Sequence, residues 1–207
     1  ARILKTPYAL VSNKPDNMPF QSGVRGLEKD PNSGHYLAPF VMASINTKVV
    51  HRTNYLLGYP WQTEFLYDEA MQYSTGFLGW RKAFGLVAGL SIFALAASFK
   101  SSRQLLEKYV VPKPGEGPTE DVVKTGFFEV ELIGKHESGQ LLRTQVTGQG
   151  DPGYGSTCRM ISETATLLLE SDKKQTGTGF ITPAAALGGQ LIDRLNNNAE
   201  VKFTQLI

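Results

Sequence analysis

The residues whose types and spacing most clearly suggest a chemical role form a glycine-rich loop. The stretch from Gly148 to Thr157 reads GQGDPGYGST, and its first six residues match G-x-G-x-x-G. In Rossmann folds this pattern places backbone N–H groups and a helix N-terminus around the pyrophosphate of a dinucleotide. A strand-like run, QLLRTQV, precedes the loop, and a helix-like run, CRMISETATLLL, follows it. The local order is therefore the one that nucleotide binding needs.

Three features of the surrounding sequence argue against a dinucleotide site. The strand of a true fingerprint lies in a parallel sheet and is nearly all apolar, whereas this run carries Arg143, Thr144 and Gln145 and belongs to a predicted hairpin. Pro152 removes one backbone N–H from the loop. The helix is predicted to begin near Ser156, beyond the last glycine of the match. We expect no nicotinamide dinucleotide to bind to this chain alone.

The same stretch has a structural interpretation. A strand–turn–helix corner would explain its glycines, with Ser156 or Thr157 as the N-cap of the helix. If an anion binds there, the helix N-terminus between Tyr154 and Thr157 is where N–H groups and the helix dipole favour negative charge. Tyr154, Ser156 and Thr157 are therefore candidate substrate-binding residues.

A second candidate anion site lies in PFVMASINTKVVHRTNYLLG, residues 39–58. Lys48 and Arg52 are one helical turn apart there and could together bind a carboxylate or phosphate of a substrate. Charged helix faces are usually solvated, and the main expectation is that their side of the helix is a solvated surface. Gly58 is predicted to end the helix. No residue is identified as catalytic, because the adjacent Asp68 and Glu69 cannot face each other across a substrate.

The predicted helix is amphipathic, and the usual arrangement turns its apolar side toward the core. The apolar side consists of Val41, Ile45, Val49 and Leu56. The polar side consists of Ser44, Lys48, His51, Arg52 and Tyr55.

Composition excludes several classes of protein. The 207 residues are 41% hydrophobic and 19% charged with a net charge of +2, and Lys and Arg are scattered, so no nucleic-acid-binding face is predicted. The single cysteine, Cys158, cannot form an internal disulfide, and this favours a reducing, cytoplasmic location. His35, His51 and His136 are far apart in sequence, so no metal site is predicted.

The chain divides into three predicted regions that give an α+β fold with a mixed or antiparallel sheet and packed helices. Residues 1–39 carry five prolines and form an extended arm, residues 40–111 are mainly helical, and residues 112–207 form an α+β unit. Because the chain begins with Ala1 and has no initiator Met, we expect it to be a piece of a longer protein.

The α+β unit is the clearest region. Thr119 is predicted to start a short helix that ends at Gly126, FFEVELIG and QLLRTQVTG to pair as a hairpin, and AEVKFTQLI to form a terminal strand. Between them, GTGF is predicted to form a short strand, with Thr182 as N-cap and Pro183 as first residue of the next helix.

The most apolar segment is AFGLVAGLSIFALAASF, residues 83–99. Its 17 residues would give about 25 Å of helix, less than the roughly 30 Å of a bilayer hydrocarbon core. Three interpretations remain: a helix buried between protein layers, which the length favours, a helix on a lipid surface, or a membrane span. In the first case we expect the helix to continue into SSRQLLEKYV.

Five motifs in order carry a family resemblance: PFVMASINTKVVHRTNYLLGY, FLYDEAM, VPKPGEGPTE, GDPGYGST and TPAAALGGQLIDRL. From about Pro39 onward the chain resembles the C-terminal half of saccharopine dehydrogenase-like oxidoreductases, a group that includes mycobacterial trans-acting enoyl reductases and a lipid-droplet-associated animal relative. The resemblance implies a protein roughly twice this length, whose N-terminal Rossmann half, missing here, binds NAD(P).

The resemblance implies that this chain is the substrate-binding, core-completing half of an NAD(P)-dependent oxidoreductase that acts on a lipid-like or imine/enoyl substrate. Its expected partners are the missing Rossmann half, a second copy in a homo-oligomer and a lipid or membrane surface. We expect the chain alone to be inactive. The alternative is a non-enzymatic lipid-surface or scaffold and dimerisation module, with residues 83–99 as its working element.

Overall fold

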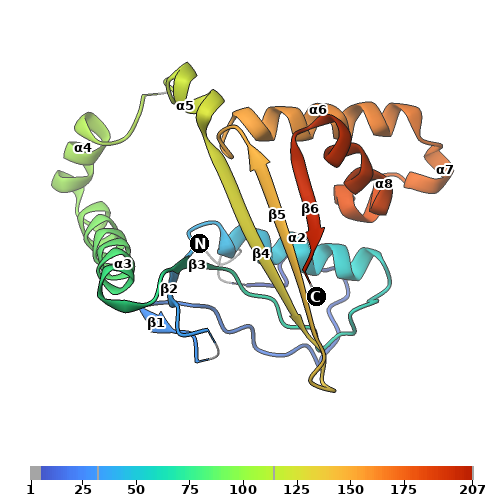
Figure 1. Cartoon of the computed structure of the whole chain (residues 1–207), viewed down its shortest axis with the longest axis horizontal. Helices are drawn as coiled ribbons and strands as arrows, with labels where there is room; N and C mark the ends of the chain where they lie inside the picture. Colours follow the sequence, from blue (N-terminus) through green and yellow to red (C-terminus); the bar gives the residue numbers. More distant parts are fainter. Residues whose placement is uncertain (1–5, 32, 114, 207) are drawn as a thin grey trace. The chain divides into compact units, whose positions relative to one another are not determined.

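The chain is α+β, as predicted, and its two sheets are antiparallel (Figure 1). The computed structural model describes residues 6–31, 33–113 and 115–206. The chain forms two compact units, Ala1–Pro114 and Gly115–Ile207. Residues 1–5 and Asn32 of the expected arm, Pro114 in the proline-rich linker and the last residue of the expected terminal strand lie outside the described residues.

The first unit contains a small sheet in which β2 is the central strand, paired antiparallel with β1 and β3. A helix follows β2, and two helices in series follow β3. The elements are β1 Glu28–Lys29, β2 Tyr36–Pro39, α2 Ala43–Leu56, β3 Ala70–Tyr73, α3 Gly76–Ser98 and α4 Lys100–Tyr109.

The chain before β1 is irregular, and it lies on α2 and on the segment that leads into β3. The Tyr8 hydroxyl donates to the carbonyl of Pro19, 2.8 Å away. The buried Gln21 donates to the Tyr8 hydroxyl and to the Phe65 carbonyl, and its side-chain oxygen accepts from the Tyr67 N–H. These bonds satisfy backbone groups that prolines and irregular structure leave without sheet or helix partners.

Helix α2 is oriented opposite to the prediction. Five residues that it buries are all polar: Thr47, Lys48, His51, Thr53 and Asn54. Its apolar side is largely exposed: Ile45 is 45% and Val49 is 40% accessible, Val41 just before the helix is 63% accessible, and Leu56 is half-buried. The expectation of a solvated polar face is therefore wrong for Lys48 and His51. The physical reason is that irregular chain covers this side, and its backbone groups need polar partners.

Asn54 and the end of α2 illustrate this. The Asn54 amide donates to the Gln62 carbonyl at 2.9 Å and accepts from the Trp61 N–H at 3.2 Å. Gly58 ends the helix as predicted, with a φ of +77° that glycine adopts without strain.

Helix α3 is longer than its apolar segment suggested. It runs through 23 residues from Gly76, so the prediction that used residues 83–99 underestimated its length. Only Gly79 and Ala83 are buried in it, where it meets β2 and β3. Within the described part of the chain no protein layer covers the rest, contrary to the interpretation of a buried helix. The predicted continuation is interrupted at Phe99, whose extended backbone (ψ 138°) separates α3 from α4.

The second unit has a three-stranded sheet in the order β4-β5-β6. As predicted, β4 and β5 form a hairpin, which runs in register from Phe127 opposite Gln149 to Lys135 opposite Leu141. The elements are α5 Glu120–Thr125, β4 Phe127–Lys135, β5 Leu141–Gln149, α6 Gly155–Glu170, α7 Lys173–Thr176, α8 Pro183–Asn198 and β6 Val201–Gln205.

The predicted helix starts in this unit are confirmed at two positions. Thr119 caps α5 through the N–H of Val122, and Thr182 caps α8 through the N–H of Ala185. Pro183 is the first residue of α8, where its missing N–H has no consequence. The short strand predicted at GTGF is wrong. Residues 177–180 form bends, because two of their glycines adopt positive φ and no neighbouring strand is available.

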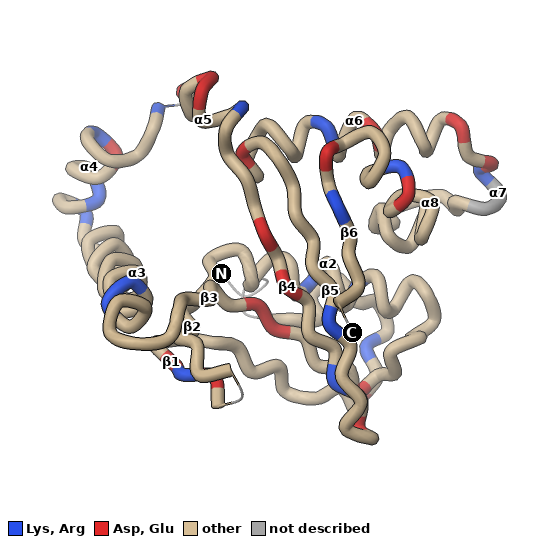
Figure 2. Tube along the Cα trace, in the orientation of Figure 1, with Lys and Arg blue, Asp and Glu red and all other residues tan. Residues whose placement is uncertain are grey.

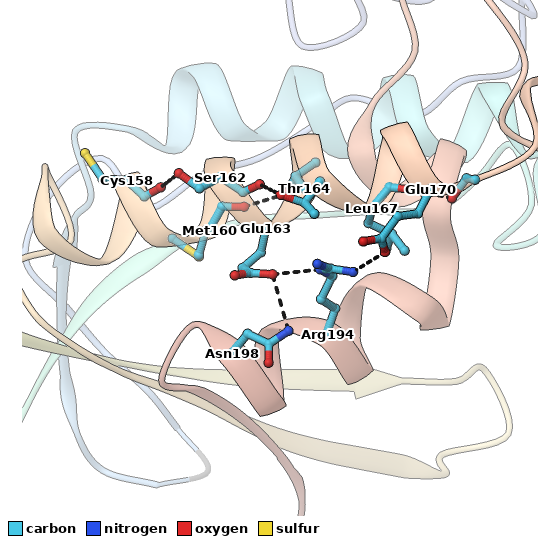
Figure 3. Close-up of polar contacts among 11 residues, drawn as sticks. Cys158, Met160, Ser162, Glu163, Thr164, Leu167, Glu170, Arg194 and Asn198 are labelled. Carbon is cyan, nitrogen blue, oxygen red and sulfur yellow. Dashed lines mark hydrogen bonds and ion pairs between the residues drawn. The ribbon is translucent and has the colours of Figure 1, made fainter.

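The core of the second unit lies between the sheet and the pair α6 and α8. Leu195, Ala199 and Val201 are buried at its centre. Five partly buried residues pack against them: Phe128, Val146, Met160, Leu191 and Phe203. Figure 3 shows Arg194 of α8 pairing with two carboxylates of α6, Glu163 at 2.7 Å and Glu170 at 2.5 Å. This ion-pair network joins the two helices on the side away from the core.

One close approach in the hairpin explains a glycine of the loop motif. Gly148 of β5 lies opposite Phe128 of β4, and the Phe128 ring occupies the space where a side chain at position 148 would start. A Cβ added there would overlap the ring.

We therefore expect Gly148→Ala to lower the free energy of unfolding by about 1–3 kcal/mol, because the ring has to move out of a packed position. Urea unfolding followed by circular dichroism measures the change. The matched control is Gly134→Ala on β4 of the same hairpin, where the nearest atoms to an added Cβ are an ordinary 3.8 Å away.

The smaller side chain of Phe128→Leu should recover part of the loss in the Gly148→Ala background. Equal destabilisation by Gly148→Ala and Gly134→Ala would contradict the packing explanation.

Candidate functional site

The glycines in the corner between β5 and α6 allow neighbouring groups to pack closely against the backbone. Besides Gly148, Gly155 at the start of α6 lies against the Val123 carbonyl, which is 2.5 Å from the position of an added Cβ. Gly150 turns the chain with a φ of +83°. The three glycines thus have structural reasons that require no ligand.

The N–H groups of this corner are occupied by Asp151. The Asp151 carboxylate accepts from the Tyr154 N–H at 2.7 Å, and its backbone carbonyl accepts from the Ser156 N–H at 2.9 Å. Tyr154 is the N-cap, so the prediction of Ser156 or Thr157 at that position is wrong. Asp151 lies upstream and closes the turn earlier, which places both predicted caps in the first helical turn.

The three corner candidates have different environments. Tyr154 is 54% exposed, and the Thr157 hydroxyl donates to the Pro152 carbonyl at 2.6 Å. Ser156 is fully buried, and its hydroxyl has no hydrogen-bond partner among the described residues. The structure does not bring their three side chains together around one open space.

The corner does not fit a dinucleotide. Its strand, β5, is the central strand of an antiparallel sheet, and the helix N-terminus already binds the carboxylate of Asp151. A pyrophosphate would have to displace or approach that negative charge. No step of a reaction is therefore assigned to this loop.

A cavity of about 260 Å³ lies in the first unit beside Lys48. The irregular chain before β1, the start of α2 and the segment before β3 line it. The lining residues are Pro7, Gln21, Ser22, Gly23, Val24, Arg25, Phe40, Ala43, Ser44, Thr47, Lys48, Tyr67 and Asp68.

Lys48 is the most deeply buried cation of this cavity. It is 6% exposed, and its ammonium group donates to the carbonyl of Ser44 one turn earlier. Asp68, which also lines the cavity, accepts from the N–H groups of Val24 at 3.1 Å and Glu69 at 2.8 Å. The cavity is therefore lined by the poorly solvated ammonium group of Lys48 and by the carboxylate of Asp68, which bonds to the backbone of two lining segments.

Tyr67 adds a hydrogen-bonding group to the cavity. Its hydroxyl donates to Glu69 at 2.6 Å, and the second Glu69 oxygen accepts from the Asn46 amide at 2.9 Å. Burial, followed by the hydrogen bond and negative charge of Glu69, raises the pKa of Tyr67 above its ordinary range. Tyr67 is thus a neutral group at physiological pH and cannot act as a base.

The structure does not make a two-point clamp from Lys48 and Arg52. Arg52 donates to the Leu10 carbonyl at 3.0 Å and lies over the Tyr55 ring, and it is not among the residues that line the cavity. The helical spacing correctly predicted that both residues share one side of α2. It could not show that Arg52 bonds to the chain that precedes the helix and not to the cavity.

His51 is a residue that the sequence alone did not single out. It is 2% exposed, its ring lies 4.6 Å from that of Tyr8 and 5.8 Å from that of Phe65, and its Nε2 has no partner among the described residues. Burial lowers the pKa of His51, so the ring is neutral near pH 7. A signal was present: polar residues 47, 48, 51 and 54 follow helical spacing. Among the residues described, no group of three His, Cys, Asp or Glu could hold a metal ion.

Comparison with known proteins finds curated relatives in mycobacteria. The chain is 34% identical over 166 residues to a provisionally named trans-acting enoyl reductase of Mycobacterium tuberculosis, which covers 79% of this chain and 40% of the relative. It is 28% identical over 204 and 207 residues to trans-acting enoyl reductases of Mycobacterium ulcerans and Mycobacterium leprae, covering 94% of this chain and 48% of each relative. The chain is a distant homologue of trans-acting enoyl reductases.

The homology covers both units of the chain, since the two longer alignments include 94% of it. The chain spans less than half of the length of these enoyl reductases. No protein-family model and no solved structure matches the chain.

The buried His51 predicts a pH dependence of stability. Because its pKa is lowered on folding, the unfolded chain binds the proton more readily, so stability is present above the unfolded pKa of about 6.5 and is lost as pH falls below it. We expect a lower urea midpoint at about pH 5.5 than at about pH 7.5.

His51→Phe keeps the ring contacts without a titrating group and should reduce this difference. His136→Asn, in the exposed hairpin turn, is the control and should leave the difference intact. An unchanged pH dependence in His51→Phe would show that other groups cause it.

Proposed function

We propose that this chain is the substrate-binding and core-completing part of an NAD(P)-dependent oxidoreductase whose substrate is an enoyl or similarly lipid-like molecule. The main support for this proposal is the homology to trans-acting enoyl reductases, which extends through both units of the chain. The geometry of the cavity beside Lys48 supports a binding role for the first unit.

The cavity favours the polar end of such a substrate. Its volume of about 260 Å³ is below the roughly 300–1,000 Å³ of sites that enclose a whole drug-sized ligand. A carbonyl or carboxylate oxygen fits this space and would be attracted by Lys48, whose charge is weakly solvated. The apolar remainder of the substrate would extend beyond the cavity.

The dinucleotide is proposed to bind to a part of the protein outside these 207 residues. Two observations support this: the β5–α6 corner does not fit it, and the relatives are more than twice as long as the region that they share with this chain. When bound, NAD(P)H supplies the reducing equivalents of an oxidoreductase. This chain would hold and orient the substrate and exclude water from it. A homo-oligomer is proposed as the assembled state.

Titration calorimetry with NADH and NADPH tests the assignment of the dinucleotide. We expect no specific binding by the 207-residue chain, and binding in the micromolar range by a protein that also contains the region found in the longer relatives. Micromolar binding to the 207-residue chain that is lost in Gly150→Val would show that the glycine-rich corner is a real dinucleotide site. Failure of the longer protein to bind either nucleotide would overturn the proposed function.

Substitution of Lys48 tests the cavity. In the longer protein, Lys48→Met should raise the KM for an α,β-unsaturated thioester about 10- to 100-fold, since a hydrogen bond to a charged group is worth about 1.5–3 kcal/mol. Arg52→Ala, on the same helix but outside the cavity, is the comparison and should change KM less than about twofold.

Urea unfolding of both variants separates a loss of binding from a loss of folding. If Lys48→Met is folded and leaves both KM and kcat unchanged, the cavity is not the substrate site. An effect of Arg52→Ala equal to that of Lys48→Met would instead restore the two-point site predicted from the sequence.

A further inference from the structure

Helix α3 is apolar on all sides from Ala83 onward, and it exposes this surface except on the side where Gly79 and Ala83 are buried and Leu86, Val87 and Leu90 are half-buried. Among its accessible residues are Phe77 (72%), Phe84 (51%), Ile92 (67%), Phe93 (48%) and Leu95 (63%). A protein partner that docks on a helix covers one stripe, whereas a helix that is apolar on all sides requires an apolar environment on all sides. Among the described helices, α3 is the one long and apolar enough to cross a membrane.

The length of α3 suits entry into a bilayer. The whole helix spans about 34 Å, but Arg81 and Lys82 lie within it, so the uncharged part from Ala83 to Ser98 spans about 24 Å and enters the roughly 30 Å hydrocarbon core without crossing all of it. The shorter estimate from residues 83–99 omitted the first turns of the helix, which carry Phe77, Leu78 and Trp80.

The polar side chains within the apolar part of α3 are already satisfied. The Ser91 hydroxyl donates to the Val87 carbonyl and the Ser98 hydroxyl to the Ala94 carbonyl, both at 2.8 Å. In hydrocarbon, an unsatisfied polar group is costly, and a hydroxyl that bonds back to its own helix avoids that cost. These serines therefore need neither water nor a polar protein partner.

The first turns of α3 have the composition of a membrane interface. The ring of Trp80 stacks on Phe77 and Phe84, with centroids 5.9 and 5.3 Å apart, and Arg81 and Lys82 follow directly. Aromatic rings and basic side chains gather at the level of lipid headgroups. Figure 2 shows that the remainder of α3 carries no charged residue.

Helix α4 continues the pattern as an amphipathic helix. Leu105 and Tyr109, one turn apart on the same side of it, are 61% and 69% exposed. Basic residues at 100, 103 and 108 accompany them, and from Gly76 to Tyr109 there are five basic residues and one acidic residue, Glu107. A basic helix with an exposed apolar side suits the headgroup region of an anionic bilayer.

We propose that α3 and α4 form a membrane-binding element: α3 lies in the hydrocarbon of a bilayer that contains anionic lipids, and α4 lies in the headgroup region beside it. The extended residue Phe99 between the two helices allows the change of direction. The element places the protein at the phase in which a lipid-like substrate accumulates. Membrane binding by α3 and α4 does not depend on whether the protein is a reductase.

Vesicle flotation of the longest available form of the protein tests the proposal. We expect it to float with phosphatidylcholine vesicles that contain phosphatidylglycerol, and the double substitution Ile92→Glu with Leu95→Glu should lower the bound fraction at least about tenfold, because two carboxylates enter the hydrocarbon. The matched control is Ile161→Glu with Leu169→Glu on α6, where both side chains are also exposed, at 66% and 87%.

Removal of Arg81 and Lys82 by Gln should reduce the preference for phosphatidylglycerol over pure phosphatidylcholine. A protein that is monodisperse without detergent and does not float would overturn the proposal, as would equal loss of flotation in the α6 control. A detergent-free oligomer that dissociates in the α3 variant without any flotation would show that a second copy covers α3.

The depth of Trp80 gives an independent measurement that does not depend on mutating α3. Trp61 is the only other tryptophan, so Trp61→Phe leaves Trp80 as the sole indole reporter. Its fluorescence should shift to shorter wavelength with vesicles and be quenched by brominated lipid chains. Quenching by aqueous iodide alone, unchanged by vesicles, would place α3 outside the bilayer.

Discussion

The first unit depends on the hydrogen bonding between the irregular chain that precedes β1 and the polar side of α2. Arg52 of α2 donates to the Leu10 carbonyl of that chain, and Gln21 of the chain bonds in turn to the Phe65 carbonyl and the Tyr67 N–H. The buried polar side of α2 bonds mainly to nearby backbone: Thr47 and Thr53 to carbonyls of their own helix, and Asn54 to the Gln62 carbonyl and the Trp61 N–H. This orientation buries His51 and Lys48, and the cavity lies beside Lys48.

The orientation of α2 determines which of its side chains are exposed. With its polar side covered, α2 presents Ile45 and Val49 outward, and α3 exposes apolar side chains over most of its circumference. Exposed apolar surface of this extent marks surfaces that bind protein or lipid. The two helices differ in kind, since α2 offers one apolar side, which a protein domain can cover, whereas only an enclosing apolar phase suits α3. This difference is one reason for the proposal that α3 and α4 bind a membrane.

The glycine-rich corner shows how far a sequence motif depends on its surroundings. Its six-residue pattern matches that of a pyrophosphate loop, yet Gly148 accommodates the Phe128 ring and Asp151 occupies the N–H groups that a phosphate would use. A dinucleotide site needs these glycines below a parallel strand. Here an antiparallel strand enters the corner, and the carboxylate of the chain itself replaces the ligand.

The sequence by itself determined the local structure of the second unit. Thr119, Thr182 and Pro183 mark helix starts through interactions within a few residues, and the alternation in β4 and β5 predicts their pairing, because these signals are local. The sequence also showed that the loop before α6 follows a hairpin. It placed the N-cap of α6 wrongly, because Asp151 accepts the N–H of Tyr154 three residues later and closes the turn before Ser156 and Thr157 are reached.

Only the tertiary structure decided which side of α2 is buried and how much of α3 is covered. Amphipathicity predicts the inward side of a helix on the assumption that the neighbouring layer is apolar, and the layer on α2 is irregular backbone. The neighbours of Lys48 and Arg52 come from residues about 20 to 40 positions away, so their different roles could not be derived from spacing on the helix. Burial is a property of the elements that surround a residue, and the sequence of one element does not contain it.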